Sequence, residues 1–193
     1  MHAHAKRGID LKPEELGRYA RHLTLPEIGL DGQQKLKSSS VLCVGSGGLG
    51  SPVLLYLAAA GIGRIGIVDN DLVEDSNLQR QVIHGMSWLG KHKCDSARES
   101  ILEINPNCKV EIFKSLLNKN NALEIIKNFD LVCDCTDNFP SRYLINDACV
   151  LLNKPNIYGS VARFEGHVTV FNLDQSSPNF RDLVPVPPPK GLL

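Results

Sequence analysis

The sequence feature that most constrains the fold is a short apolar run that leads directly into a glycine-rich loop. The apolar run is Val41–Val44, and the loop that follows it, Gly45–Gly50, reads GSGGLG. A helical pattern, Ser51–Ala60, starts where the loop ends. A strand, a G-x-G-x-x-G loop and a helix in this order form the phosphate-binding unit of parallel α/β sheets. We therefore predict a nucleotide-binding site at this loop.

The glycines of the loop have separate physical roles in such a unit. Gly45 permits the tight turn after the strand, Gly47 lets the backbone approach a phosphate, and Gly50 lets the helix pack closely against the strand. Gly48 lies in the same loop. The N–H groups at the start of the helix then face the anion. A glycine turn without a ligand is the alternative, and the flanking strand and helix argue against it.

The rest of the chain alternates between apolar runs and helical patterns. The runs predict strands at Val41–Val44, Arg64–Val68, Lys109–Phe113, Leu131–Asp134, Asn156–Tyr158 and Glu165–Phe171. The segments around them predict helices at Leu11–Leu23, Asp31–Leu36, Ser51–Ala60, Lys91–Ile104, Ala122–Asn128 and Ser141–Leu152. This alternation indicates a Rossmann-like α/β fold, a mostly parallel sheet with helices on both faces. Because the last strand alternates in polarity, we expect it to run antiparallel to the others.

The sequence divides into three regions that differ in composition and in their predicted secondary structure. Residues 1–40 are predicted to form an N-terminal helical extension, and residues 41–175 the Rossmann-like domain. The tail, residues 176–193, is rich in proline, and we predict no secondary structure in it.

Charge balance and hydropathy narrow the class of protein. Lys plus Arg and Asp plus Glu number 21 each, so no net charge attracts nucleic acid or an anionic membrane. The longest apolar stretch, Val53–Ala60, is too short to span a bilayer, and residues 1–11 lack the apolar core of a signal peptide. We expect a cytoplasmic protein with neither a nucleic-acid nor a membrane partner. Reduced thiols are expected for its six cysteines, Cys43, Cys94, Cys108, Cys133, Cys135 and Cys149.

Charged residues follow the second predicted strand. Asp69 ends that strand 24 residues after Gly45, where a carboxylate can accept hydrogen bonds from ribose hydroxyls. To this point the pattern fits NAD as well as ATP. Asp71, Arg80 and Lys93 come next, and the two cations can converge on a triphosphate. A solvated surface pair is the alternative for these cations.

Asp137 and Asn138 follow the strand Leu131–Asp134 at its carboxyl end. Open α/β sheets bind ligands at this end, and a carboxylate there can hold Mg²⁺ together with substrate phosphates. Asp137 is therefore a candidate magnesium ligand. Its alternative role is to cap the N-terminus of the helix that follows.

Six blocks of sequence, in this order, resemble the MoeB/ThiF family of adenylyltransferases, which are related to ubiquitin-activating enzymes. The blocks are Arg18-Tyr19-x-Arg21-His22, Gly45–Gly50, Asp69, Ser76-Asn77-Leu78-Gln79-Arg80-Gln81, Gly90-Lys91-x-Lys93 and Asp134-x-Thr136-Asp137-Asn138. The resemblance extends from about Leu16 to Pro189. The SNLQRQ and DCTDN blocks are far more specific than the glycine loop alone.

The resemblance implies an activity. Members of this family use ATP and Mg²⁺ to adenylate the C-terminal Gly-Gly carboxylate of a small ubiquitin-like sulfur-carrier protein. For this chain we expect a carrier of molybdopterin biosynthesis. Gly48 would lie in the phosphate loop and Asp69 would hold the ribose, while the catalytic residues Arg80 and Lys93 would contact phosphates. Asp137, also catalytic, would lie at the nucleotide and its metal.

The resemblance also implies supporting residues and a second subunit. Asp71, Asn77, Gln81 and Asn138 would line the same nucleotide site. Arg21 would be a further catalytic residue, reaching the nucleotide bound by the other subunit of a homodimer.

The sequence departs from many relatives in two respects. Pro178–Asp182 stands where a first zinc-binding C-x-x-C pair is expected, so we predict no zinc and a place in the zinc-free branch, whose longer members often add a rhodanese domain. Family chains also continue past the proline run into a segment with a transfer cysteine. We therefore expect either a truncated member or a remainder supplied elsewhere.

Other functions stay open at this stage. A thiamine-pathway or tRNA-thiolation carrier would use the same pocket, and a non-catalytic nucleotide-binding or dimerisation module is a further alternative. A nicotinamide-dependent oxidoreductase does not explain Arg80, Lys93 and Asp137 together. We interpret His84, His92 and His167 as structural.

Overall fold

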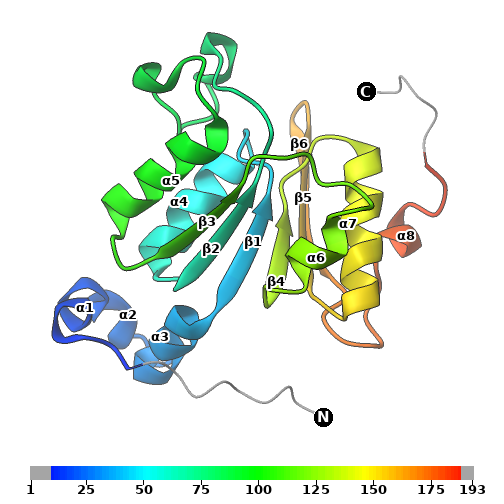
Figure 1. The fold of residues 1–193 in the computed structure, drawn as a ribbon. Coiled ribbons are helices and arrows are strands. Elements are labelled where there is room, and N and C mark those ends of the chain that lie inside the picture. The colour runs from blue at the N-terminus through cyan, green and yellow to red at the C-terminus, as the bar shows by residue number, and fades with distance from the viewer. Residues whose placement is uncertain (1–9, 188–193) are drawn as a thin grey trace.

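The computed structural model describes residues 10–187, which fold around one six-stranded sheet (Figure 1). Across the sheet the strand order is β3-β2-β1-β4-β5-β6. The strands are β1 (Ser40–Val44), β2 (Arg64–Val68), β3 (Lys109–Phe113), β4 (Leu131–Asp134), β5 (Asn156–Ala162) and β6 (Glu165–Phe171). All neighbouring pairs are parallel except β5 and β6. The Rossmann-like fold and the antiparallel last strand are thereby confirmed.

Helices cover both faces of the sheet (Figure 1). They are α1 (Pro13–Arg18), α2 (Ala20–Leu23), α3 (Gly29–Ser38), α4 (Gly50–Ala60), α5 (Lys93–Ile104), α6 (Ala122–Ile126), α7 (Phe139–Leu152) and α8 (Phe180–Leu183), with the 3₁₀ turns η1 (Asp75–Asn77) and η2 (Met86–Trp88). One apolar core lies between the sheet and α4 and α5, and a second lies between the sheet and α6 and α7.

The central strand β1 supplies both cores because its side chains alternate between the two faces. Val41 and Cys43 belong to the core under α4 and α5, whereas Leu42 and Val44 belong to the core under α6 and α7. All of β1 is buried. Full burial of each large aliphatic side chain stabilises the fold by about 1.5–3 kcal/mol. The neighbouring strands β2 and β4 also contribute side chains to both cores.

The predicted helix Leu11–Leu23 is wrong as a single element, since it is broken at Tyr19. This residue has φ −99° and ψ 15°, and separate helices, α1 and α2, lie on either side of it. The ring of Tyr19 is buried, and its hydroxyl accepts a hydrogen bond of 3.0 Å from Nδ2 of Asn105. The helix is thus broken at the residue whose ring is buried against the domain.

The tail contains a short helix that the sequence pattern does not predict. Asn179 caps α8 by accepting a hydrogen bond from the backbone N–H of Arg181, at 2.9 Å. Phe180 is buried in an aromatic cluster with Tyr143, Tyr158 and Phe171. This packing, rather than local propensity, orders the helix. The last residues of the predicted tail, 188–193, lie outside the described residues, as do residues 1–9 of the predicted N-terminal extension.

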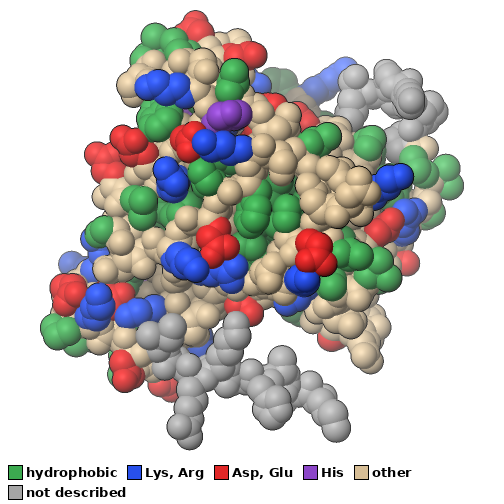
Figure 2. Space-filling model, in the orientation of Figure 1, with side chains coloured by type: hydrophobic (Ala, Val, Ile, Leu, Met, Phe, Trp, Pro, Cys, Tyr) green, Lys and Arg blue, Asp and Glu red, His purple; other side chains and the backbone are tan. Residues whose placement is uncertain are grey.

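The surface of the described part carries no dominant charge on the face shown in Figure 2, where acidic and basic side chains are interspersed. No helix within residues 10–187 is long and apolar enough to cross a bilayer. All six cysteines lie in the described part as free thiols, and only Cys135 is partly exposed.

Candidate functional site

A pocket of about 1220 Å³ opens at the carboxyl ends of the parallel strands. Its walls come from the loops after β1, β2, β3 and β4, and from the β5–β6 hairpin. This is where open α/β sheets bind ligands, because loops from neighbouring strands diverge there and leave a crevice. The lining includes the predicted residues Gly45, Gly47, Gly48, Asp69, Asp71, Arg80, Gln81, Lys93, Asp137 and Asn138.

The glycine loop is shaped by close backbone contacts. Gly45 has φ +92°, and a Cβ added there would lie 2.9 Å from the carbonyl oxygen of Cys135. A Cβ at Gly50 would lie 2.1 Å from the carbonyl oxygen of Gly45, so only glycine lets α4 begin this close to β1. Gly50 is buried behind the loop and does not line the pocket.

Asp69 fastens the loop to the end of β2. Its Oδ2 accepts hydrogen bonds from both the backbone N–H and the hydroxyl of Ser46, each at 2.8 Å, and its Oδ1 accepts one from the N–H of Asp71 at 2.9 Å. Because each carboxylate oxygen has two lone pairs, Oδ2 is fully used and Oδ1 can accept one more hydrogen bond. Asp69 therefore organises the loop and still lines the pocket with an acceptor atom.

Two cations flank the loop. Arg80 lies in the β2–α5 segment, residues 69–92, and Lys93 is the first residue of α5. Arg80 is exposed, and its Nη1 donates to the carbonyl oxygen of Ser76 at 3.2 Å. Lys93 is 5% exposed, and its Nζ lies 3.0 Å from Oδ2 of Asp71, whose side chain is 60% exposed. A nearly buried ammonium with one exposed partner is an incompletely neutralised charge, which favours an anionic ligand.

The loop after β4 supplies the opposite wall. Asp137 and Asn138 are both exposed there, and the side chain of Asn138 accepts a hydrogen bond from the N–H of Ser141 at 3.0 Å. Asn138 is therefore the N-cap of α7, and the alternative prediction that Asp137 fills this role is wrong. The Asp137 carboxylate is left at the pocket edge.

Buried groups hold this second loop in place. Oδ1 of Asp134 accepts hydrogen bonds from the N–H and hydroxyl of Thr136, at 3.0 and 2.7 Å. Burial raises the pKa of Asp134. Arg142 donates from Nη2 to the carbonyl oxygen of Thr136 at 3.1 Å, and its guanidinium lies 5.3 Å from the ring centre of Tyr158.

The β2–α5 segment packs along the glycine loop. A Cβ at Gly47 would lie 3.5 Å from Nε2 of Gln81, and one at Gly48 would lie 3.7 Å from Cδ of Arg80. Further along, Trp88 lies on η2 with Nζ of Lys91 5.0 Å from its ring centre. The SNLQRQ block therefore forms part of the wall above the loop.

Besides Gly50, two predicted residues do not line the main pocket. Asn77 is buried within its own turn and lines a smaller, adjoining pocket of about 390 Å³ that shares Asp71 and Lys93 with the main one. Arg21 is exposed on α2, which lies at the opposite end of the sheet from the pocket (Figure 1). The side chain of Arg21 does not line its own chain's pocket.

Several lining residues were not predicted. They come from the loop after β3, from α7, from the β5–β6 hairpin and from α8, and include Ser115, Leu116, Leu117, Arg142, Tyr158, Ser160, Val161, His167 and Val184. The rule that ligands bind at the carboxyl ends of strands would have found Ser115–Leu117, since β3 was predicted correctly. The hairpin residues carry no local signal, because only the sheet order brings them to the pocket.

No three His, Cys, Asp or Glu side chains within residues 10–187 are grouped so that they alone could hold a metal ion. A divalent ion that keeps waters and binds substrate phosphates needs only one or two protein carboxylates. Asp137 is exposed at the pocket edge and fits that requirement.

Comparison with known proteins gives consistent matches. Residues 19–193 match the model of the ThiF family. The chain is 53% identical over 186 residues to the Probable adenylyltransferase/sulfurtransferase MoeZ of Mycobacterium tuberculosis, covering 95% of this chain and 47% of that protein. It is 56% identical over 169 residues to the Probable molybdopterin-synthase adenylyltransferase of Porphyra purpurea, covering 88% and 44%. The chain thus spans about half the length of the curated relatives it matches.

Solved structures share the fold. PaaA superposes with a TM-score of 0.80 at 26% identity, covering 94% of this chain and 58% of that one. E. coli MccB with ATP superposes with a TM-score of 0.67 at 30% identity, covering 76% and 46%. Together with the strand order, the glycine loop and the family match over residues 19–193, these similarities show that the chain belongs to the ThiF family.

Proposed function

We propose that this protein uses ATP and Mg²⁺ to adenylate the C-terminal glycine carboxylate of a small ubiquitin-like sulfur-carrier protein ending in Gly-Gly. The observation that carries the proposal is the placement of Arg80 and Lys93 beside the glycine loop, with Asp137 on the other wall of the same pocket. Relatives named as adenylyltransferases, one of them for molybdopterin synthase, support this function and favour the molybdopterin pathway.

The chemistry asks for positioning and charge neutralisation rather than a general base. The carrier's carboxylate is already ionised near pH 7. Its oxygen forms a bond to the α-phosphorus of ATP while the bond from that phosphorus to the pyrophosphate oxygen breaks, which gives an acyl-adenylate and pyrophosphate. Arg80, Lys93 and the N–H groups of the glycine loop would stabilise the negative charge on the phosphates. Mg²⁺ bound near Asp137 would supply further positive charge.

The proposal includes a cytoplasmic homodimer. Arg21 belongs to α2, which lies at the end of the sheet opposite the pocket, so it could act in catalysis only on a nucleotide held by another subunit. Velocity sedimentation of the protein should give the mass of a dimer, and mixing Arg21→Ala with Lys93→Ala subunits should restore part of the activity that each variant lacks. No restoration in a confirmed mixed dimer would contradict the role of Arg21.

Pyrophosphate–ATP exchange tests the reaction directly. The protein, incubated with ATP, Mg²⁺, labelled pyrophosphate and a Gly-Gly carrier, should incorporate label into ATP, and Arg80→Ala should abolish this. Arg98→Ala is the matched control, since Arg98 is exposed on α5 and does not line the pocket. Carriers from the molybdopterin, thiamine and tRNA-thiolation pathways should be compared side by side. Absence of exchange with every carrier would overturn the proposal.

The exchange assay also separates the proposal from the alternative of a nucleotide-binding module without catalysis. Calorimetric binding of ATP without exchange would support that alternative.

A further inference from the structure

His84 is a buried polar residue directly beneath the glycine loop. It is 7% exposed, and both ring nitrogens have partners: Nε2 lies 3.0 Å from the carbonyl oxygen of Ser46, and Nδ1 lies 3.0 Å from the hydroxyl of Ser96. A carbonyl oxygen can only accept, so Nε2 carries the proton. Burial lowers the pKa of His84, which favours the neutral ring, and in the neutral ring with Nε2 protonated Nδ1 accepts from the hydroxyl of Ser96.

The bond to Ser46 fixes the orientation of one peptide group in the loop. The Ser46 carbonyl and the Gly47 N–H belong to the same planar trans peptide, so they point in opposite directions. Because His84 holds the carbonyl toward the interior, the Gly47 N–H is turned away from the interior, at a residue that lines the pocket. Within residues 10–187 no acceptor is bonded to that N–H. It is therefore available to an anionic ligand.

The other half of Ser46 is held independently. Asp69 accepts from its N–H and its hydroxyl, so Ser46 is fastened on the β2 side by a carboxylate and on the α5 side by an imidazole. The element that carries His84 is itself anchored to α5, where the hydroxyl of Ser100 donates to the carbonyl oxygen of Ile83 at 2.7 Å. The imidazole is thus a fixed donor rather than a mobile one.

We propose that His84 is a positioning residue for nucleotide binding: its Nε2–H sets the Ser46–Gly47 peptide so that the Gly47 N–H is presented to a phosphate of the nucleotide. The proposal rests on the proposed function only in assigning ATP phosphates to this loop. If His84 only filled space, the volume of its ring would matter and the donor at Nε2 would not. Substitutions that keep or remove this donor can therefore distinguish positioning from space filling.

Matched substitutions separate the donor from the volume. His84→Gln places an amide N–H near the position of Nε2. His84→Asn places one near Nδ1 instead, which leaves the Ser46 carbonyl only the long contact of 3.4 Å from the hydroxyl of Ser51. Calorimetric affinities for ATP and for adenosine should be measured for both variants and the wild type. Because one hydrogen bond is worth about 1 kcal/mol, His84→Asn should lose about five- to tenfold in ATP affinity. Adenosine, which has no phosphate, should bind both variants about equally, and His84→Gln should retain most of the ATP affinity.

These affinities test the role of His84 separately from the proposed function, which fails if the wild type itself does not bind ATP. If the wild type binds ATP and the two variants lose ATP affinity equally, or lose adenosine affinity in step with ATP, the positioning role is overturned. Where His84→Asn does not fold, as judged by its thermal midpoint, His84→Met replaces it, since Met matches Gln in length and lacks the donor. Ser96→Ala removes only the other hydrogen bond and should leave ATP affinity within about threefold, and a larger loss would also contradict the proposal.

Discussion

Gly50 is the residue at which the loop leaves least space for a side chain. A Cβ there would lie 2.1 Å from a carbonyl oxygen of the backbone, which cannot rotate out of the way. Gly17, on the exposed helix α1, has nothing within 4 Å of the same added atom. A side chain therefore fits at Gly17 and does not fit at Gly50.

Gly50→Ala should therefore destabilise the protein by about 1–3 kcal/mol or more, because α4 must move away from β1 to accommodate the methyl group. Gly17→Ala should be neutral or stabilising by up to about 1 kcal/mol, since alanine loses less backbone entropy in a helix. Urea denaturation of both variants measures the difference. Equal stability of the two variants would contradict the packing of the glycine loop described above.

Neighbouring residues can be equivalent in sequence and differ in role. Asp137 and Asn138 are both good N-caps by type, and only the backbone conformation decides that Asn138 fills this role. Asp69 was predicted from its spacing, but its bonds to Ser46 were not predictable, because they require the glycine loop to fold back over β2. For Asp69 and Asp137 the sequence therefore predicted a place at the carboxyl ends of the strands, where both line the pocket, but not how each is bonded.

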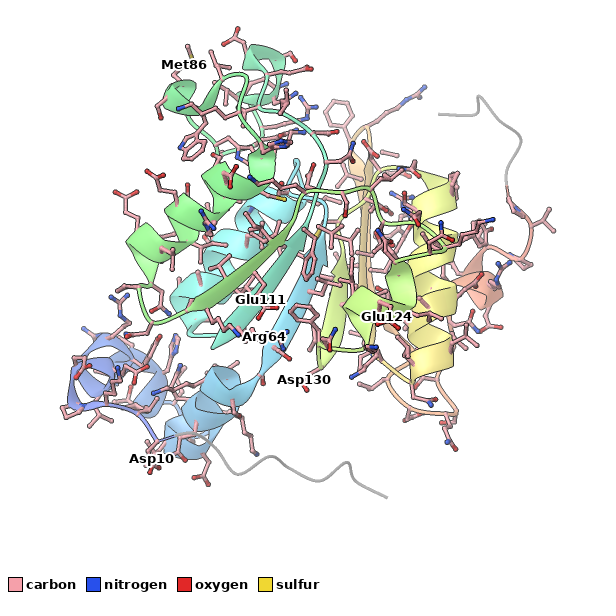
Figure 3. The ribbon with its side chains drawn as sticks, viewed as in Figure 1. Asp10, Arg64, Met86, Glu111, Glu124 and Asp130 are labelled. Carbon is pink, nitrogen blue, oxygen red and sulfur yellow. The ribbon has the colours of Figure 1, made fainter. Side chains whose placement is uncertain are left out.

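At the scale of elements, β2 and β3 are joined by an ion pair at one end of the sheet. Arg64 donates from Nε and Nη2 to the two carboxylate oxygens of Glu111, both at 3.0 Å (Figure 3). Hydrogen bonds from Arg64 and then Lys109 lower the pKa of Glu111 from 4.5 to about 2. The pair is partly exposed, so its contribution is about 1 kcal/mol or less.

Glu111→Gln should lower the free energy of unfolding by up to about 1 kcal/mol at pH 7. The pKa of this carboxyl is depressed in the folded state, so its contribution is complete above pH 4.5 and is lost as the pH falls toward 2. The variant and the wild type should thus converge over that range in denaturant titrations. Glu124→Gln is the control, since Glu124 pairs with Lys127 within one exposed turn of α6, and it should change stability by less than about 0.5 kcal/mol.

The helix α8 should depend on one side chain. Phe180→Ala removes a buried ring from the cluster of Tyr143, Tyr158 and Phe171, and should cost about 3–5 kcal/mol if the cluster cannot close around the cavity. Leu183→Ala, in the same helix, removes a side chain that is 57% exposed and should cost much less. Thermal midpoints of the two variants distinguish them, and similar losses would contradict the burial of Phe180.

The elements that sequence predicted well are those whose pattern is local. The strands Arg64–Val68 and Leu131–Asp134 have the predicted bounds, because a buried parallel strand is a mostly apolar run. The edge strand Lys109–Phe113 also has the predicted bounds, although it is only partly buried and alternates charged with apolar residues at its start. The break at Tyr19 and the helix α8 were missed for the opposite reason. Both depend on an aromatic ring that is buried against distant residues, and no local pattern carries that information.

At the scale of the whole molecule, two apolar cores share the strands of one sheet. Loss of β1 would expose both cores at once, so the described domain should unfold in a single cooperative transition. Far-UV circular dichroism and calorimetry should then give the same midpoint.

ATP should raise that midpoint, because the pocket is assembled from loops after four different strands and exists only in the folded sheet. At a free ATP concentration of 100 times Kd, the free energy of unfolding should rise by about 2.7 kcal/mol. Arg80→Ala should show a smaller rise at the same ATP concentration, while Arg98→Ala should match the wild type. An unchanged midpoint with saturating ATP would contradict nucleotide binding.

The position of Trp88 makes this residue an intrinsic fluorescent probe of one segment. The chain contains one tryptophan, and it lies on η2 within the same β2–α5 segment that carries Arg80, Gln81 and His84. Selective excitation of the indole therefore reports on this segment alone, with Lys91 close to the ring as a charge that shifts the emission. Stopped-flow fluorescence can therefore test whether this segment changes its environment when ATP is added, without any added dye.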